Sequence, residues 1–288
     1  MKSSALVFLA AFLALSASWG GFVLAPQIQL GREGQSKTLG LGELYPQARA
    51  GLAQEGLQVY RANGCVYCHS QSVGQTGTMC EIVLTEAGTN LVAVQAALAR
   101  LAPTTIIASL PQTILKVADV PTADPFVKTL RDAGAKAEVR IVPTGPDIER
   151  GWGVRRSVAQ DYLFDQPVQL GTQRIGPDLA NVGLRPLDAS WHLLHLYAPA
   201  AVVTGSTMPP YRFLFETRKL EFGRPASPEA LPLTGDLAPP PGYEVVPKPE
   251  ARALVAYLLS LRANAPLFDA PVTPPVVIAA ATTNAPAK

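Results

Sequence analysis

Three side chains with fixed spacing could hold a cofactor. Cys65, Cys68 and His69 form a Cys-x-x-Cys-His pattern, in which two thiols can add to the vinyl groups of a haem and the next imidazole can bind its iron. The pattern predicts one covalently bound haem c. A thioredoxin-like redox pair, half of a zinc site and a chance match are the alternatives. A redox pair should follow a strand, but residues 52–60 have helical spacing, and a zinc site needs four ligands.

A haem iron with one histidine ligand needs a second axial ligand. A thioether in that place raises the reduction potential, which suits electron transfer. The chain has three methionines. Met1 precedes an apolar run and Met79 lies at the edge of a separate segment, so Met208 is the candidate. Pro209 and Pro210 would fix the backbone beside its sulfur. Loop packing is the alternative role for Met208.

Two residues are candidates for supporting the haem site. A metal-bound histidine donates its other ring proton to a carbonyl or carboxylate, and Pro177 is the candidate acceptor for His69. Arg174 could pair with a haem propionate through a bidentate contact. A solvated surface position is the alternative for Arg174. Pro177 and Arg174 are therefore expected near the cofactor.

His192 and His195 are three residues apart, so on a helix they share one face. Such a pair suggests a metal site or a second haem. No third or fourth ligand is visible in the sequence, which favours a structural role or hydrogen bonds at the haem edge.

Composition excludes several classes of protein. The 288 residues carry 24 basic and 22 acidic side chains, a net charge of +2, which gives no reason to propose nucleic acid as a partner. Three cysteines rule out a disulfide scaffold. With two of them assigned to haem, Cys80 is expected to be a plain thiol.

The amino terminus has an uncharged run from Ala5 to Leu24, about the ~20 residues that a helix needs to cross a bilayer. Either this segment is a retained anchor or it is a signal cleaved near Ser18. Trp19 and Phe22 suit a spanning helix with aromatic residues near the interface. Both alternatives place the rest of the chain outside the cytoplasm.

Hydrophobic spacing predicts two main helices. One covers residues 52–60 and leads into Cys65. The other begins at Pro249 and Glu250 and places Leu254, Tyr257, Leu258 and Leu261 on one face. Residues 26–44 are rich in Gly and polar residues and are expected to be a linker. The Pro-rich run 225–249 is expected to be a loop, and the tail after Pro266 to be poorly ordered.

Several motifs together resemble one family, the membrane-anchored mono-haem subunit (subunit II) of cbb3-type cytochrome c oxidases. The motifs are Gly64-Cys65-Val66-Tyr67-Cys68-His69-Ser70-Gln71, Arg150-Gly151-Trp152-Gly153, Asp161-Tyr162, Gly171 to Gly183 with Arg174 and Gly176-Pro177-Asp178-Leu179, Trp191-His192, His195-Leu196, and Gly205-Ser206-Thr207-Met208-Pro209 with Tyr211. They cover most of the chain outside residues 78–148.

The resemblance implies a fold and a role. The fold would be mainly α: a class I cytochrome c-like domain, in which the first and last helices cross, with one N-terminal transmembrane helix. His69 and Met208 would be the axial ligands of the haem iron, and the equivalent of Pro177 supplies the carbonyl to the histidine in class I cytochromes. The subunit would not itself be catalytic. It would pass electrons to a catalytic haem-copper subunit beside a further cytochrome c subunit, at a bacterial inner membrane with the haem domain on the periplasmic side.

Residues 78–148 depart from the oxidase pattern. They predict a small α+β domain ordered β-α-α-α-β: a strand at 81–85, helices at 91–101, 104–110 and 123–133, and a strand at 137–142, with a short middle strand at 114–116. The motifs Ala87-Gly88, Asn90-Leu91-Val92-Ala93-Val94 and Asp132-Ala133-Gly134-Ala135-Lys136-Ala137-Glu138-Val139 resemble the carboxy-terminal domain of the large-subunit ribosomal stalk protein. The Gly- and Lys-bearing factor-binding segment of that family has no counterpart here, so the partner of this domain stays open.

The expected organisation is an anchor at 1–25, a cytochrome c domain at 26–77 and 149–265, the insert at 78–148, and a tail at 266–288. Two other functions compete with the oxidase subunit. One is a cytochrome c subunit of a periplasmic dehydrogenase complex. The other is a binding module that carries a haem domain, in which the insert has the primary role.

Overall fold

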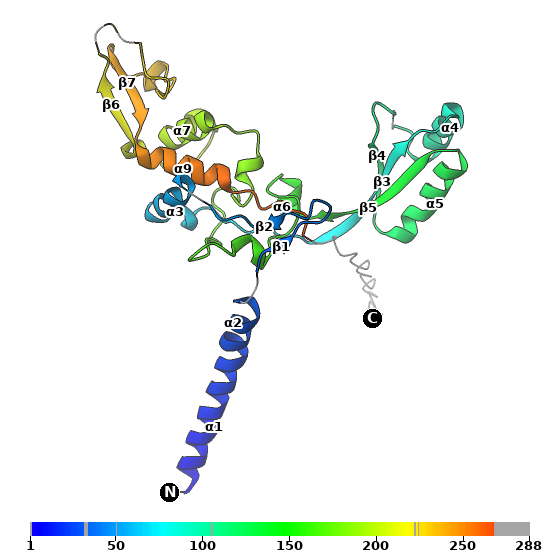
Figure 1. Cartoon of the computed structure of the whole chain (residues 1–288), viewed down its shortest axis with the longest axis horizontal. Helices are drawn as coiled ribbons and strands as arrows, with labels where there is room; N and C mark the ends of the chain where they lie inside the picture. Colours follow the sequence, from blue (N-terminus) through cyan, green and yellow to red (C-terminus); the bar gives the residue numbers. More distant parts are fainter. Residues whose placement is uncertain are drawn as a thin grey trace, which may run out of the picture. The chain divides into compact units, whose positions relative to one another are not determined.

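The chain forms two compact units, shown in Figure 1. The computed structural model describes residues 2–31, 34–49, 51–104, 106–221, 223 and 225–267. One unit, called here the split unit, consists of Met1–Val73 and Ser157–Leu267, and the other, the inserted unit, contains Gly74–Arg156. The inserted unit is wider at both ends than the predicted insert 78–148. Nearly all of the predicted tail lies outside the described residues.

The described elements are mixed in type. The split unit contains the helices α1 Lys2–Trp19, α2 Ala25–Leu30, α3 Leu52–Ala62, α7 Ala189–Tyr197, α8 Pro199–Val202 and α9 Pro249–Ser260, and the strands β1 Ser36–Lys37, β2 Leu44–Tyr45, β6 Phe215–Lys219 and β7 Tyr243–Pro247. The inserted unit contains β3 Gly77–Glu86, α4 Leu91–Leu101, β4 Gln112–Val117, α5 Val120–Asp132, β5 Lys136–Thr144 and α6 Pro146–Glu149. The described elements are therefore mixed helix and strand and not clearly mainly α as predicted, because strands form in both units.

The N-terminal helix is long, apolar and exposed. It runs through α1, a π-helical turn at Gly20–Leu24 and α2, and its apolar part, Ser4–Gln29, has 26 residues. At 1.5 Å per residue this part is about 39 Å long, against about 30 Å for the hydrocarbon core of a bilayer. Its length and composition suffice for crossing a membrane, and a signal sequence meets the same criterion.

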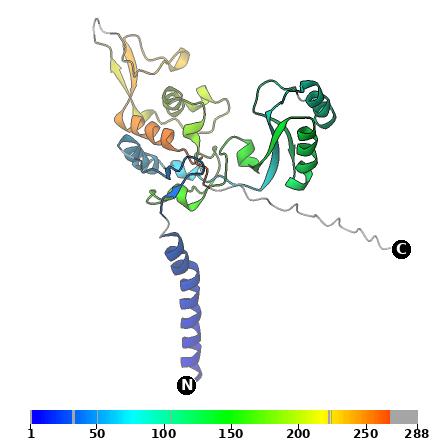
Figure 2. The same cartoon turned by 45° about the vertical axis from the view of Figure 1, so that its right-hand side comes forward.

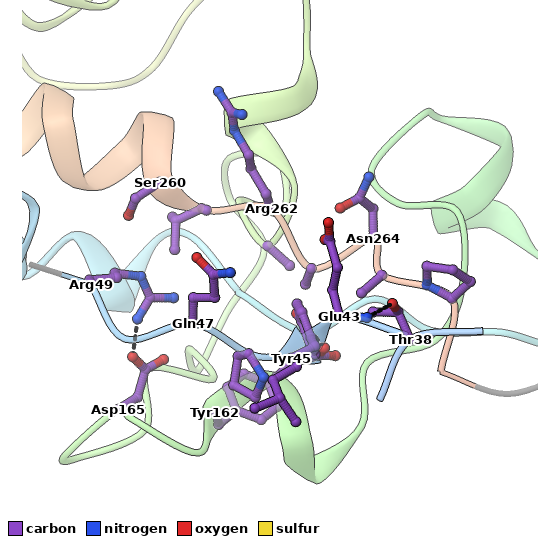
Figure 3. Close-up of a pocket in the computed structure, with 18 of the residues that line it drawn as sticks. Thr38, Glu43, Tyr45, Gln47, Arg49, Tyr162, Asp165, Ser260, Arg262 and Asn264 are labelled. Carbon is purple, nitrogen blue, oxygen red and sulfur yellow. Dashed lines mark hydrogen bonds and ion pairs between the residues drawn. The ribbon is translucent and has the colours of Figure 1, made fainter. Parts of the chain in front are cut away.

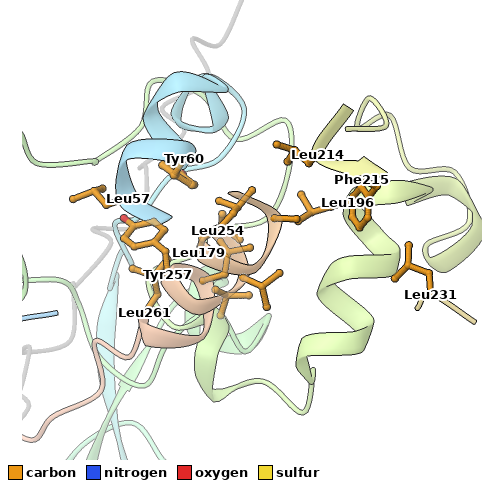
Figure 4. Close-up of a cluster of buried hydrophobic side chains, with 14 of the residues drawn as sticks. Leu57, Tyr60, Leu179, Leu196, Leu214, Phe215, Leu231, Leu254, Tyr257 and Leu261 are labelled. Atoms are coloured by element: carbon orange, nitrogen blue, oxygen red, sulfur yellow. The ribbon is translucent and has the colours of Figure 1, made fainter. Parts of the chain in front are cut away.

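Helices α3 and α9 pack closely against each other in the core of the split unit (Figure 4). Gly56 makes this approach possible, because a Cβ atom there would lie 1.8 Å from the carbonyl oxygen of Ala253. Leu57, Tyr60 and Tyr257 are at most 1% exposed, and the two tyrosine rings lie 5.2 Å apart. Burying each such side chain contributes roughly 1.5–3 kcal/mol. The two helices that the sequence predicts therefore form the centre of this unit.

Two segments expected to be irregular contain strands. In the predicted linker 26–44, β1 pairs with β2 through Ser36 and Tyr45. In the Pro-rich run 225–249, β7 pairs with β6 in antiparallel register, with Phe215 opposite Pro247. Val245 and Val246 of β7 are buried. The density of Gly and Pro conceals these strands in the sequence.

The inserted unit is a three-stranded antiparallel sheet of order β4-β3-β5 with α4 and α5 packed against it (Figure 2). Ile82 and Leu84 of β3 lie on the face of the sheet that packs against the helices, and both are fully buried. The N-termini of the helices are capped by Asn90 and Asp119, whose side chains accept hydrogen bonds from Ala93 N and Thr122 N. These side chains explain where the two helices begin.

The prediction of a helix at 104–110 in the insert is wrong. The described residues 104 and 106–110 are turns and irregular backbone, and the order is β-α-β-α-β. The side chain of Gln112 explains part of this, because it donates to Ile106 O at 2.8 Å and accepts from Ala108 N at 2.9 Å. These bonds satisfy the backbone locally without a helix.

The chain leaves and re-enters the split unit at adjacent positions. Ser157 N donates to Val73 O at 3.0 Å, and Val73 N donates to Ser157 Oγ at 2.9 Å. Within the inserted unit, Thr76 N donates to Thr144 O at 2.9 Å. The insert therefore occupies a position in the split unit that a short connection could close.

Candidate haem site

Helix α3 delivers the Cys-x-x-Cys-His segment to the core of the split unit. The helix ends at Ala62, and Gly64 turns the chain in the left-handed conformation with a φ of +66°. A short helical turn from Cys65 follows, and His69 N donates to Cys65 O at 3.0 Å. This turn fixes the two thiols and the imidazole relative to one another.

The imidazole of His69 is held in one tautomer. Its Nδ1 lies 2.8 Å from the carbonyl oxygen of Pro177. A carbonyl only accepts hydrogen bonds, so Nδ1 carries the proton and Nε2 keeps its lone pair. Burial lowers the pKa of His69 from its ordinary value, so the ring is neutral at pH 7. The arrangement is the one that a histidine ligand of iron requires.

Gly176 lies against the face of the same ring. A Cβ atom at this position would lie 2.2 Å from Cε1 and 2.6 Å from Nδ1 of His69. Gly176 N also donates to Cys68 O at 2.9 Å. The segment around Pro177 is thus paired directly with the Cys-x-x-Cys-His segment.

Asp178 joins these two segments from the inside. Its carboxylate is fully buried and accepts hydrogen bonds from Ser70 Oγ at 2.6 Å, Ser72 N at 2.7 Å and Ala180 N at 2.8 Å. The guanidinium of Arg174 donates to Ser70 Oγ and Ser72 O, with its Nη2 3.9 Å from Asp178. Arg174 therefore bridges protein loops. A propionate contact at Arg174 stays a prediction.

A largely apolar cavity lies beside the imidazole. Its lining consists of Tyr60, Cys65, His69, Pro177, Leu179, Val182, Arg185, Leu187, Trp191, His192, His195, Leu196, Met208, Leu254 and Leu258. Four of the predicted site residues, Cys65, His69, Pro177 and Met208, therefore meet at one cavity. Cys68 is partly buried. Neither Cys68 nor Arg174 is part of this lining.

Several residues of the lining have the chemistry that a haem would need. Burial raises the pKa of the Cys65 thiol to about 11, so this side chain is an uncharged thiol in an apolar wall. Leu179, Leu254 and Leu258 are buried apolar side chains in the core of the split unit, which suits a porphyrin face. His69 presents a free Nε2 lone pair to a metal. The lining thus supplies one thiol, one imidazole lone pair and apolar side chains, while the second thiol, Cys68, lies outside it.

Sequence reasoning missed Arg185 and Asp178. Arg185 lines the cavity, and its guanidinium donates to the carbonyl oxygen of Asp178. Nothing in the pattern around Asp178 marks it as buried, since acidic residues are rarely inside a protein. Its place in a Gly-Pro-Asp-Leu turn, directly after the histidine's carbonyl partner, is the one available signal.

A second cavity, of about 550 Å³, is lined by both polar and apolar residues (Figure 3). Arg49 forms an ion pair with Asp165, and Tyr45 donates to Asp161 at 2.8 Å. Burial raises the pKa of Asp165 despite the opposing effect of Arg49. Neither the two haem-motif cysteines nor His69 lines this cavity. Its side chains attach residues 38–49 to the rest of the split unit.

The described residues contain no group of three or more His, Cys, Asp and Glu side chains that could hold a metal ion. Cys80 is a free thiol, 1% exposed in the core of the inserted unit, and burial raises its pKa. This agrees with the expectation of a plain thiol.

Comparison with known proteins finds one matching family model. Residues 139–227 match the family model described as cytochrome C oxidase, mono-heme subunit/FixO. The matched region begins within β5 and includes Pro177, His192 and Met208. No curated protein matches the chain. The match confirms the resemblance to the mono-haem subunit of cytochrome c oxidase that the sequence motifs predict, and it leaves the resemblance of the insert untested.

Proposed function

We propose that this chain is the membrane-anchored, mono-haem c electron-transfer subunit of a cbb3-type haem-copper oxidase. One observation carries the proposal. In a chain that matches the mono-haem subunit family, a neutral His69 oriented by Pro177 opens onto the same cavity as Cys65 and Met208. The thiols of Cys65 and Cys68 would attach the haem, and His69 and Met208 would bind its iron.

The bound haem would supply a single-electron redox centre. The chain's own residues have three tasks. His69 and Met208 would hold the iron in both oxidation states, and the Pro177 carbonyl restrains the His69 ring by accepting a hydrogen bond from its Nδ1–H. The buried leucines exclude water, which limits the change in solvation when the charge on the iron changes. None of these tasks needs a catalytic acid or base.

The described N-terminal helix supports anchoring in a membrane. The proposed position is a bacterial inner membrane with the haem domain on the periplasmic side. The proposed partners are the catalytic haem-copper subunit, which would receive the electrons, and a further cytochrome c subunit. The name of the matched family, which is that of an oxidase subunit, supports this choice.

Purification of the complex through a carboxy-terminal tag tests the proposal. The expected result is co-purification with a haem-copper subunit, together with one haem that stays on this chain under denaturing conditions. The Cys65→Ala and Cys68→Ala double variant should lose that haem and serves as the control. Recovery with a dehydrogenase instead would support a cytochrome subunit of a periplasmic dehydrogenase. A main phenotype that survives Cys65→Ala would support a binding module centred on the insert.

A further inference from the structure

Two buried imidazole nitrogens without a hydrogen-bond partner belong to residues that line the candidate haem cavity. His192 is 4% exposed, and its Nε2 atom has no hydrogen bond. His195 Nδ1 is likewise buried without a hydrogen bond, and both side chains line the cavity. Leaving a buried polar atom unpaired costs about 1–3 kcal/mol. Two such atoms in residues that line one cavity therefore suggest that a bound ligand completes their hydrogen bonds.

The helix that carries these histidines is firmly positioned. Asp188 caps α7, since its side chain accepts a hydrogen bond from Trp191 N at 2.7 Å. The Trp191 ring stacks on His195 with centroids 4.7 Å apart, and it meets His192 edge-on at 5.1 Å. Trp191 itself lines the cavity. Both imidazole rings thus contact one indole ring, which restrains their orientation.

Both histidines are neutral at pH 7. Burial lowers the pKa of His192 to about 4, and burial also lowers the pKa of His195. A neutral imidazole has one N–H donor and one acceptor nitrogen. Arg185 lines the same cavity and brings a positive charge. The cavity wall therefore combines a cation with two imidazoles that can each donate one hydrogen bond, a combination that suits carboxylates.

We propose that His192 Nε2 and His195 Nδ1 donate hydrogen bonds to the carboxylates of the haem, so that α7 is a positioning element for the cofactor. This inference rests on the proposed function, which supplies the haem. The porphyrin of haem c carries two propionates, and a carboxylate leaving water needs donors to compensate for lost hydration. The pair is thus neither a separate metal site nor a source of axial ligands.

The unmodified chain offers a direct test, because it contains only three histidines. Full-length protein with covalent haem, labelled with ¹⁵N-histidine and reduced so that the iron is diamagnetic, should give signals from three imidazole rings. The expected tautomers are Nδ1–H for His69, Nε2–H for His192 and Nδ1–H for His195, with slowly exchanging protons at all three. The reverse tautomer at His192 or His195, or protons that exchange at the solvent rate, would overturn the proposal.

Variants test the same point through the haem itself. His192→Leu and His195→Leu should shift the propionate bending mode in the resonance Raman spectrum and change the reduction potential, because the donors that offset part of the propionate charge are lost. His192→Gln places an N–H near the Nε2 position and His195→Asn near the Nδ1 position, so each should restore the wild-type spectrum. Leu193→Ala, a partly buried neighbour on α7 that does not line the cavity, should destabilise the fold without moving the mode.

Three results are decisive against the proposal. A Leu variant with unchanged propionate mode and potential would leave the histidines as packing groups. A Leu variant with an altered axial-ligand spectrum would make that histidine an iron ligand. If the Leu variants fail to fold, the His192→Gln and His195→Asn variants decide. Unchanged tautomers of the remaining histidines and an unchanged propionate mode support the proposal, and a change in either opposes it. Protein that folds without covalent haem would instead refute the proposed function.

Discussion

Gly176 lies so close to His69 that no other residue fits between the backbone and the imidazole. A Cβ atom would approach three ring atoms, Cε1, Nδ1 and Nε2, at 2.2–2.9 Å. The contact is steric and does not depend on an unusual backbone angle. It fixes the position of the ring from one side, while the carbonyl of Pro177 fixes it at the Nδ1 edge.

Gly176→Ala should therefore displace the ring. We expect a several-fold loss of haem-loaded protein and a cost of roughly 1–3 kcal/mol, the usual range for overpacking. Haem staining after denaturing electrophoresis and thermal unfolding measure the two effects. Gly205→Ala is not a neutral control, since Gly205 has a φ of +76°. Gly34→Ala is suitable, because a Cβ there would contact nothing within 4 Å. Normal loading of Gly176→Ala would contradict the steric argument.

Met208→Ala should keep the covalent haem but lower its reduction potential, on the order of 0.1 V or more, because the thioether that favours reduced iron is lost. A redox titration followed by visible absorbance measures the shift. Met79→Ala is the matched control, since Met79 lies in β3 of the inserted unit and outside the cavity. An unchanged potential and ligand spectrum in Met208→Ala would show that the sixth ligand lies elsewhere.

Asp178→Asn should destabilise the split unit by roughly 1–3 kcal/mol, because in either orientation the amide N–H₂ would face a backbone N–H. These are the N–H of Ser72, which donates to Asp178 Oδ2 at 2.7 Å, and the N–H of Ala180, which donates to Oδ1 at 2.8 Å. Urea denaturation of the purified chain measures the change. Arg174→Gln, which alters the exposed partner of the same network, should cost less than about 1 kcal/mol. If Arg174→Gln destabilised the split unit as much as Asp178→Asn or more, the arginine and not the carboxylate would be the main stabilising group.

Removal of the insert should leave the haem site intact. Thr76 and Thr144 are already joined by a hydrogen bond, and Val73 pairs with Ser157 in the split unit. Replacing residues 77–144 by a short Gly/Ser linker is therefore expected to keep haem attachment and the potential near normal. Any loss should be in assembly or docking. Failure to attach haem would show that the insert contributes to the haem site. Residues 74–156, expressed alone, are expected to fold.

The mature protein should retain its N-terminal helix. The apolar segment Ser4–Gln29 continues for 11 residues past the cleavage site expected near Ser18, and its length suits a spanning helix. Amino-terminal sequencing of protein extracted from membranes tests this. A sequence that starts near residue 19 would mean that the segment is a cleaved signal.

The haem motif, the candidate ligand Met208 and the two long helices were accessible from the sequence alone. Each depends on local information: the spacing of Cys65, Cys68 and His69, and the recurrence of Leu254, Tyr257 and Leu258 on one helical face. The same holds for strands β3 and β5 of the insert, whose alternating side chains are visible in the sequence.

The tertiary structure decided what depends on partners distant in the chain. Strand β7 forms because it pairs with β6 across a Pro-rich loop, and the helix expected at 104–110 is replaced by bonds to Gln112. The buried carboxylate of Asp178 is stable because it meets Ser70 and Ser72, more than a hundred residues away in the chain. Periodicity describes which residues share a face of one element, and it does not show which groups from other elements will satisfy a buried charge or an unpaired strand.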